Sequence, residues 1–332
     1  MDKHNDNILS VKNLVVHYET QDGVAEAVNN ISFSLKKGEA LGLVGETGAG
    51  KTTVALSIMG LLPHPPAHVI QGEIEFNGED LLQKDKKQMR AIRGNDISMI
   101  FQDPMTALNP VETIGSQVAE VIRLHSKVSK AEANVMAQEM LLTVGIQPDR
   151  FNEYPHQFSG GMKQRVVIAI ALACNPTLLL ADEPTTALDV TIQAQVLQQI
   201  KELREKFGTS MILITHDFGV VADICDKCAI LYAGEIVEAG TLEQIFDHPM
   251  HPYTKGLFDS IPSLDDEVDR LKPIPGMMSS PMDLPPYCSF YDRCEHRCDK
   301  CKERDSVSVE VGEGHIVKCL LYEKEGGQPE YE

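Results

Sequence analysis

The sequence predicts an α/β fold in which helices cover a mostly parallel β-sheet. An apolar run at residues 40–44 ends in a glycine-rich loop, and a helical segment follows that loop directly. Two more runs, 178–181 and 211–215, are continuously apolar, as expected for strands that are buried on both faces. Helical segments alternate with these strands, which is typical of a parallel sheet with helices on both faces.

Length and composition limit the class of protein. The 332 residues suffice for one large domain with a small appendage, or for two modest domains. The formal charge of −19 argues against a surface that binds nucleic acid throughout. No apolar run reaches the roughly 18 residues of a membrane span, and the first residues lack the apolar core of a signal peptide. We therefore expect a cytosolic chain that reaches a membrane only through a partner.

The other elements can be placed along the chain by composition and spacing. Segments 8–16 and 31–35 are rich in Val, Ile, Leu and Phe and predict strands, as do 73–76 and 96–101. Apolar residues recur at helical spacing in 110–145, 161–174 and 193–207. After about residue 248 the chain becomes proline-rich and irregular, so we place a domain boundary near residue 260.

The glycine-rich loop at residues 45–52 fits the pattern G-x-x-x-x-G-K-[ST]. Its glycines let backbone N–H groups curl around phosphate oxygens, and the following helix points its positive end at the same phosphates. Lys51 would supply a cation to the β and γ phosphates, and the Thr52 hydroxyl would bind Mg²⁺. The predicted nucleotide-binding residues here are Gly45, Glu46, Thr47, Gly48, Ala49, Gly50, Lys51, Thr52 and Thr53.

Two of the predicted strands end in residues that suit phosphate chemistry. The strand at 178–181 runs into Asp182, placed to hold Mg²⁺, and Glu183, placed to polarise an attacking water. The strand at 211–215 runs into His216, which would sense the γ phosphate. The alternative for each is an ordinary solvated side chain at a strand end. The phosphate loop in the same sheet favours the catalytic interpretation.

Residues 158–165 read FSGGMKQR, and this segment resembles the LSGGQ signature of ABC ATPases. Ser159 and the N–H groups at the start of the following helix would form a second phosphate clamp. The resemblance implies that this clamp, made by Ser159, Gly160, Gly161 and Met162, completes the ATP site of a second ATPase subunit.

Further positions match the same family. Gln102 resembles the Q-loop glutamine, which contacts Mg²⁺ and links to the transmembrane partner, and residues 187–189, ending in Asp189, resemble the D-loop. His216 falls at the H-loop. Tyr18 resembles the aromatic residue that stacks on adenine, although it also suits a half-buried strand position. The family assigns Mg²⁺ to Thr52, Gln102 and Asp182.

The resemblance also implies an architecture. It is that of a P-loop NTPase, with a RecA-like parallel-sheet core, an antiparallel β subdomain and a helical subdomain at about 105–175. Residues 1–260 would form the nucleotide-binding domain, and residues 261–332 a C-terminal extension with a cysteine cluster.

Met162, the run ALACNP and the HPY sequence at 251–253 resemble the oligopeptide, dipeptide and nickel importer group. This implies ATP hydrolysis that powers peptide import, by a heterodimer with a sister ATPase on the cytoplasmic face of the membrane. Two permease subunits and an extracytoplasmic binding protein would complete the system, and no nucleic acid would take part. The alternative that the chain serves an importer of nickel or another small solute remains open. A soluble ABC ATPase is disfavoured, because the chain has one phosphate loop and one signature.

Five of the eight cysteines follow the proline-rich segment. Four thiolates within about 30 residues suit a [4Fe–4S] cluster or Zn²⁺, in a segment with too few apolar residues for much core. Free thiols are the third alternative. The resemblance implies a [4Fe–4S] cluster on Cys288, Cys294, Cys301 and Cys319, while Cys298 competes with Cys301 for the third place.

Overall fold

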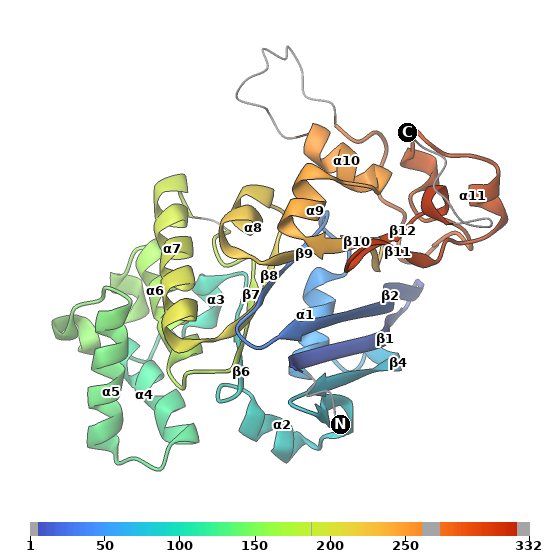
Figure 1. Cartoon of the computed structure of the whole chain (residues 1–332). Coiled ribbons are helices and arrows are strands. Elements are labelled where there is room, and N and C mark those ends of the chain that lie inside the picture. The colour runs from blue at the N-terminus through green and yellow to red at the C-terminus, as the bar shows by residue number, and fades with distance from the viewer. Residues whose placement is uncertain (1–5, 187, 261–272, 324–332) are drawn as a thin grey trace.

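The computed structural model describes residues 6–186, 188–260 and 273–323, and Figure 1 shows their arrangement. The predicted position Ala187, beside the D-loop aspartate, lies outside the described residues. So do the first five residues and the segments 261–272 and 324–332 of the predicted C-terminal extension. No helix in the described ranges combines the length and the apolar character needed to cross a bilayer.

An eight-stranded sheet forms the centre of the molecule, in the order β11-β12-β10-β9-β3-β8-β7-β6. Five of its strands pair in parallel, among them the three predicted from the apolar runs at 40–44, 178–181 and 211–215. They are β6 (Ile97–Ile100), β7 (Leu178–Asp182), β8 (Ser210–Thr215), β3 (Ala40–Val44) and β9 (Lys227–Tyr232). The remaining strands, β10 (Glu235–Thr241), β12 (His315–Lys318) and β11 (Ser308–Gly312), pair antiparallel at one edge.

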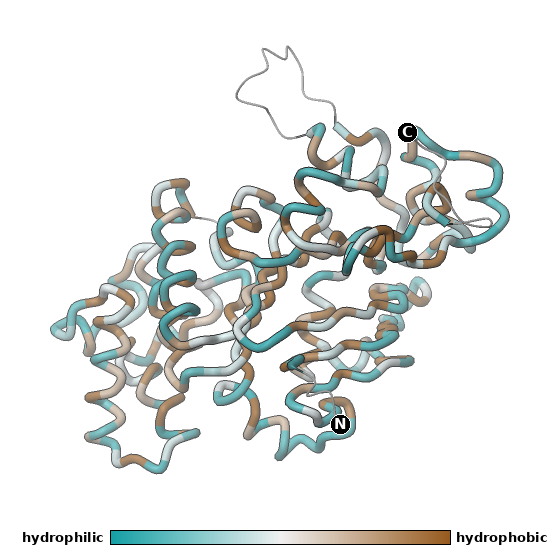
Figure 2. The backbone as a smooth tube through the Cα atoms, in the orientation of Figure 1, coloured by the Kyte–Doolittle hydropathy of each residue, from teal (hydrophilic) through white to brown (hydrophobic). Residues whose placement is uncertain are grey.

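A second, antiparallel sheet packs on one side of the core. Its strands lie in the order β2-β1-β4-β5, with bounds Gly23–Lys36, Asn7–Thr20, Ala67–Phe76 and Glu79–Asp80. Alternate residues of β1 are buried on either side of a register shift, Leu9 and Val11 before it and Leu14 and Val16 after it. They join Leu41 and Leu43 of β3 in one hydrophobic cluster. In Figure 2 the hydrophobic colour concentrates along the central strands, where this cluster lies.

Helices supply the other layers. Those of the first half are α1 (Lys51–Met59), α2 (Lys86–Ile92), α3 (Pro104–Ala107), α4 (Ile114–His125), α5 (Lys130–Thr143) and α6 (Gly160–Leu172). The second half has α7 (Val190–Phe207), α8 (Phe218–Ile224), α9 (Leu242–Asp247), α10 (Pro252–Asp259) and α11 (Lys300–Glu303). Single 3-10 turns lie at Leu81–Gln83, Pro148–Asn152, Pro155–Gln157, Tyr291–Arg293 and Leu320–Tyr322.

The helical subdomain contains α3 to α6 and lies at the left of Figure 1. The segment predicted as helical at 110–145 divides into two helices, because Ser129 begins α5 with a capping box that includes Glu132. Helix α4 buries Val118 and Ile122, which lie four residues apart on one face. The predicted α/β architecture with a parallel core, an antiparallel β subdomain and a helical subdomain is confirmed.

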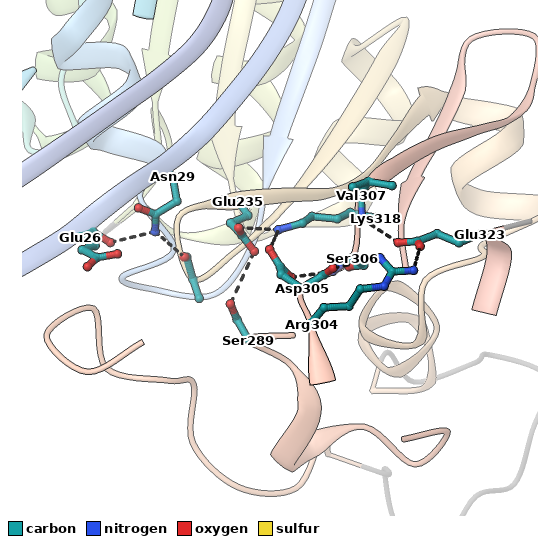
Figure 3. A network of polar contacts seen from close by, with 11 residues as sticks. Glu26, Asn29, Glu235, Ser289, Arg304, Asp305, Ser306, Val307, Lys318 and Glu323 are labelled. Atoms are coloured by element: carbon teal, nitrogen blue, oxygen red, sulfur yellow. Dashed lines mark hydrogen bonds and ion pairs between the residues drawn. The ribbon is translucent and has the colours of Figure 1, made fainter. Parts of the chain in front are cut away.

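The C-terminal residues extend the main sheet. Strand β12 pairs with β10, where Glu238 faces Val317, and the hairpin β11–β12 forms the sheet edge. A polar network fastens this hairpin to the core: Lys318 donates to both Glu235 of β10 and Asp305 (Figure 3). Ser289 also donates to Glu235, at 3.5 Å. Residues 273–323 therefore pack directly on the main sheet.

Candidate nucleotide-binding and catalytic site

The phosphate loop joins the end of β3 to the start of α1. Gly50 has a φ of +99°, and a Cβ atom there would lie 2.3 Å from the carbonyl oxygen of Ala27. A Cβ atom on Gly45 would lie 2.2 Å from the carbonyl oxygen of Leu231. Neither position can hold a side chain without moving backbone atoms. The glycines of the motif are thus required by close contacts as well as by backbone conformation.

Lys51 folds back over the loop that precedes it. Its Nζ atom donates to the carbonyl oxygens of Gly45, at 2.7 Å, and of Glu46, at 3.0 Å. Burial lowers the pKa of Lys51, while the charges of Glu183, Asp182 and Glu46 act in the opposite direction. The ammonium group therefore lies against the backbone of the loop that is predicted to bind phosphate.

Asp182 ends β7 and is only 3% exposed. Burial raises its pKa, although a hydrogen bond with the Thr52 side chain acts to lower it. Two of the three predicted Mg²⁺ ligands, Thr52 and Asp182, therefore meet in the structure. Oxygen donors are those that Mg²⁺ prefers, so this pair fits the ion chemically.

Glu183 is the centre of a second polar cluster. Its Oε2 atom accepts from Gln102 Nε2 at 3.0 Å and from Thr186 Oγ1 at 2.9 Å, and its Oε1 atom lies 3.3 Å from His216 Nδ1. Burial acts to raise the pKa of Glu183, but the hydrogen bonds from Thr186 and His216, with the charges of His216 and Lys51, hold it below its ordinary value. The side chain is a carboxylate at neutral pH and can accept a proton or orient a water.

The sequence prediction named Gln102, Glu183 and His216 but missed Thr186. The signal that could have found it is its spacing, since a residue three positions after Glu183 in a turn can face back toward that carboxylate. The structure brings all four side chains together from three separate loops at the carboxyl ends of β6, β7 and β8. That edge of a parallel sheet is where ligands bind.

Tyr18, predicted to stack on adenine, lies on β1. Its hydroxyl is 3.3 Å from Thr53 Oγ1 at the start of α1. The tyrosine ring is therefore close to the phosphate loop although 35 residues separate the two in sequence. This position is compatible with a base stacked on the ring, which stays a prediction.

The signature residues begin helix α6. Ser159 is the N-cap residue, it is exposed, and its side chain makes no capping hydrogen bond. A Cβ atom on Gly161 would lie 2.4 Å from Ile192 Cγ2, so this glycine permits close packing of α6 on α7.

Asp189, the predicted D-loop residue, caps α7: its Oδ1 atom accepts a hydrogen bond from the N–H group of Ile192 at 3.0 Å. Arg150 donates to Met162 Sδ at 3.3 Å.

The four predicted cluster ligands, Cys288, Cys294, Cys301 and Cys319, line one small pocket together with His251. Burial raises the pKa of Cys288 to about 11 and that of Cys319 to about 12, so both are thiols at neutral pH. In the described part of the chain, no group of three or more His, Cys, Asp or Glu side chains is placed so that it could hold a metal ion. The four thiols thus share a pocket, but the structure does not arrange them as a set of metal ligands.

The remaining cysteines behave as core residues. Cys225 and Cys228 are buried, and burial raises the pKa of Cys225 to about 12. Cys174 is half-buried, and burial raises its pKa too. Cys225 and Cys228 are thus small hydrophobic groups of the interior.

Comparison with known proteins agrees with this geometry. Residues 28–186 match the family described as ABC transporter, and residues 237–301 match the family described as oligopeptide/dipeptide transporter, C-terminal region. The oligopeptide transport ATP-binding protein AppD of Bacillus subtilis is 47% identical over 97% of this chain and 98% of its own length. The dipeptide transport ATP-binding protein DppD of the same organism is 50% identical over 96% of each chain.

Among solved structures, a dimeric ATP-binding cassette in a post-hydrolysis state, bound to ADP and Pi, is similar in fold. It has a TM-score of 0.64 and 30% identity, and the match covers 70% of this chain and 98% of that one. The phosphate loop, the acidic strand end and the match along nearly the whole length lead to one conclusion. The chain belongs to the ABC transporter family, in its group of peptide-transport ATP-binding proteins.

Proposed function

We propose that this chain hydrolyses ATP and thereby powers the import of dipeptides or oligopeptides through a membrane permease. The observation that carries the proposal is the convergence of Gln102, Glu183 and His216 at the carboxyl edge of the sheet that also holds the phosphate loop. The near full-length similarity to oligopeptide and dipeptide transport ATP-binding proteins supports peptides as the transported class.

In this proposal each group acts on the phosphates of ATP. The N–H groups of the loop and the N-terminus of α1 bind the phosphate oxygens, and Lys51 adds a cation. Mg²⁺ held by Thr52, Asp182 and Gln102 would neutralise phosphate charge. Glu183, a carboxylate at neutral pH, orients the attacking water and accepts its proton, while His216 holds that carboxylate in place.

The site is completed by a second subunit. Ser159 and the exposed first turn of α6 would bind the triphosphate held by a sister ATPase, and each subunit would complete the site of the other. The dimeric cassette of similar fold supports this arrangement. We propose further that two permease subunits bind the pair at the cytoplasmic face of the membrane. An extracytoplasmic binding protein would then deliver the peptide.

The test of the catalytic assignment is Glu183→Gln in the assembled transporter. The variant should bind ATP as tightly as the unchanged protein, because the phosphate contacts stay, and its hydrolysis rate should fall by at least about 100-fold. The matched control is Glu205→Gln, at an exposed position of α7, which should hydrolyse ATP at the normal rate. Hydrolysis at the normal rate by Glu183→Gln would refute the role of this residue.

A metal centre at Cys288, Cys294, Cys301 and Cys319 stays a prediction. The shared pocket supports it, and the absence of a coordinating group in the described residues speaks against it. A metal would displace the protons that these buried thiols hold. Protein purified without oxygen should contain iron and absorb visible light, and Cys288→Ser should lose both, whereas Cys298→Ser should keep both. Protein with neither iron nor zinc would rule the centre out.

A further inference from the structure

An arginine of the C-terminal module, which is the described part of the C-terminal extension (residues 273–323), forms an ion pair with the phosphate loop. Arg293 lies in the 3-10 turn Tyr291–Arg293, and its Nη1 atom is 3.0 Å and 3.1 Å from the two carboxylate oxygens of Glu46. Glu46 is the second residue of the phosphate loop. The arginine side chain is 6% exposed and the glutamate side chain 32% exposed. This ion pair joins residues that are 247 positions apart in sequence.

Arg293 is itself held by the module and by β9. Its Nε atom donates to the carbonyl oxygen of Pro275 at 3.0 Å. The guanidinium carbon lies 5.7 Å from the ring centre of Tyr232 and 5.9 Å from that of Phe290. These contacts fix the guanidinium before any nucleotide is present, so little conformational entropy is lost in pairing it with Glu46.

Other contacts bring the module and α10 to the same loop. The hydroxyl of Tyr253 accepts from the N–H group of Glu46 at 3.1 Å. A Cβ atom on Gly48 would lie 3.2 Å from Cε of Met278, so this methionine lies against the loop. The phosphate loop is therefore contacted by residues of α10 and of the C-terminal module, which lie more than 200 positions further along the chain.

The charge of Glu46 makes this support relevant to nucleotide binding. Glu46 is close enough to Lys51 that its charge acts to raise the pKa of that lysine. An uncompensated carboxylate at this position would repel the phosphates of ATP, which carry several negative charges. The paired guanidinium removes this repulsion while it keeps the loop in one conformation.

We propose that Arg293 is a positioning residue for ATP binding: it neutralises Glu46 and holds the phosphate loop without touching the nucleotide. The proposal rests on the ATPase function proposed above and adds a part for the C-terminal module in setting nucleotide affinity. The alternative is a purely structural role, in which Arg293 only fastens the module to the core. In that case the effect of removing the arginine on ATP binding would not depend on the charge of Glu46.

The experiment measures the dissociation constant of a fluorescent ATP analogue with the full-length chain. Arg293→Gln should weaken binding by about 10-fold, because the carboxylate is then bare. The double variant with Glu46→Gln should return to within about threefold of the unchanged protein, and so should Arg293→Lys, which keeps the charge. The matched control is Arg297→Gln in the same module, which should bind normally.

In the assembled transporter, Arg293→Gln should raise KM for ATP with little change in kcat, because the catalytic cluster around Glu183 is untouched. Normal ATP binding by Arg293→Gln would overturn the proposal. So would a double variant as weak as the single one, since that result indicates a structural part only. An unchanged protein that fails to bind ATP would overturn the proposed function itself, and the two failures are distinguishable.

Discussion

At the scale of single residues, Glu183 shows how the fold places a side chain at some cost. Its φ of +44° lies in the left-handed region, which a residue with a side chain rarely adopts. Its N–H group donates to the carbonyl oxygen of Ile214 at 2.8 Å, and its carboxylate is bound by Gln102, Thr186 and His216. Such strained positions occur where function requires a particular direction of the side chain. At Glu183 that direction is toward the sheet edge.

His251 provides a prediction for acid conditions. It is 2% exposed, its Nδ1 atom accepts from the N–H group of Tyr253 at 3.0 Å, and burial lowers its pKa to about 3. The unfolded chain binds a proton near pH 6.5 but the folded one does not, so stability is lost as pH falls from about 6.5 toward 3. At pH 5 this difference in proton binding should lower the free energy of unfolding by about 2 kcal/mol.

The measurement is urea unfolding at pH 7.5 and pH 5.0. Other groups titrate in this range too, so the informative quantity is the difference between the unchanged protein and His251→Asn, which keeps an acceptor but does not titrate. Between the two pH values the variant should lose about 2 kcal/mol less than the unchanged protein. Equal losses in the two proteins would show that His251 accepts a proton in the folded state.

At the scale of elements, the hairpin β11–β12 depends on a buried acid of β10. Glu238 is fully buried and lies 2.8 Å from Nε2 of His315 on β12. Its carboxylate also accepts from the N–H groups of Met250, at 2.8 Å, and His251, at 2.9 Å. One acid thus joins the edge hairpin, the core sheet and the start of α10.

His315→Ala should destabilise the protein by about 2–4 kcal/mol, because a buried carboxylate loses one of its partners. Urea unfolding gives the magnitude, and hydrogen exchange at the β12 amides should accelerate more than exchange in β3. His248→Ala, at an exposed position after α9, serves as the control and should change stability little. A loss below about 0.5 kcal/mol would mean that the pair contributes nothing net.

Sequence patterns predicted the elements of the core well, for identifiable reasons. The parallel strands are buried on both faces, so β3, β7 and β8 appear as continuous apolar runs of about their true length. The hairpin β11–β12 was not predicted. Val309 and Val311 alternate with polar residues in its strand Ser308–Gly312, but the strand is short and mostly exposed. Its place is set by backbone pairing with β12, which in turn pairs with β10.

At the scale of the whole molecule, the proposed dimer makes the clearest prediction. Ser159→Arg puts a bulky group at the exposed start of α6, which would face the nucleotide of the sister subunit. The isolated chain should bind ATP normally, because its own phosphate loop is unchanged. In the assembled transporter, hydrolysis should fall by about 100-fold, since one phosphate clamp is blocked.

The two readouts are ATP binding by the isolated chain and ATP hydrolysis by the assembled complex. Ser34→Arg, on the exposed side of β2, is the matched control and should leave both of them unchanged. If Ser159→Arg lowers ATP binding by the isolated chain to the same degree as hydrolysis, the clamp acts within one subunit and the proposed dimer is wrong.

By itself the sequence determined the nucleotide chemistry, because the phosphate loop, the acidic strand end and the signature are short contiguous motifs whose function follows from local backbone geometry. Only the tertiary structure decided which distant residues meet. The ion pair between Arg293 and Glu46 joins positions 247 residues apart, and the contact between His315 and Glu238 joins positions 77 residues apart. Gln102 and His216 likewise reach Glu183 from the ends of separate strands. Such contacts depend on how the layers pack, and no local pattern encodes that packing.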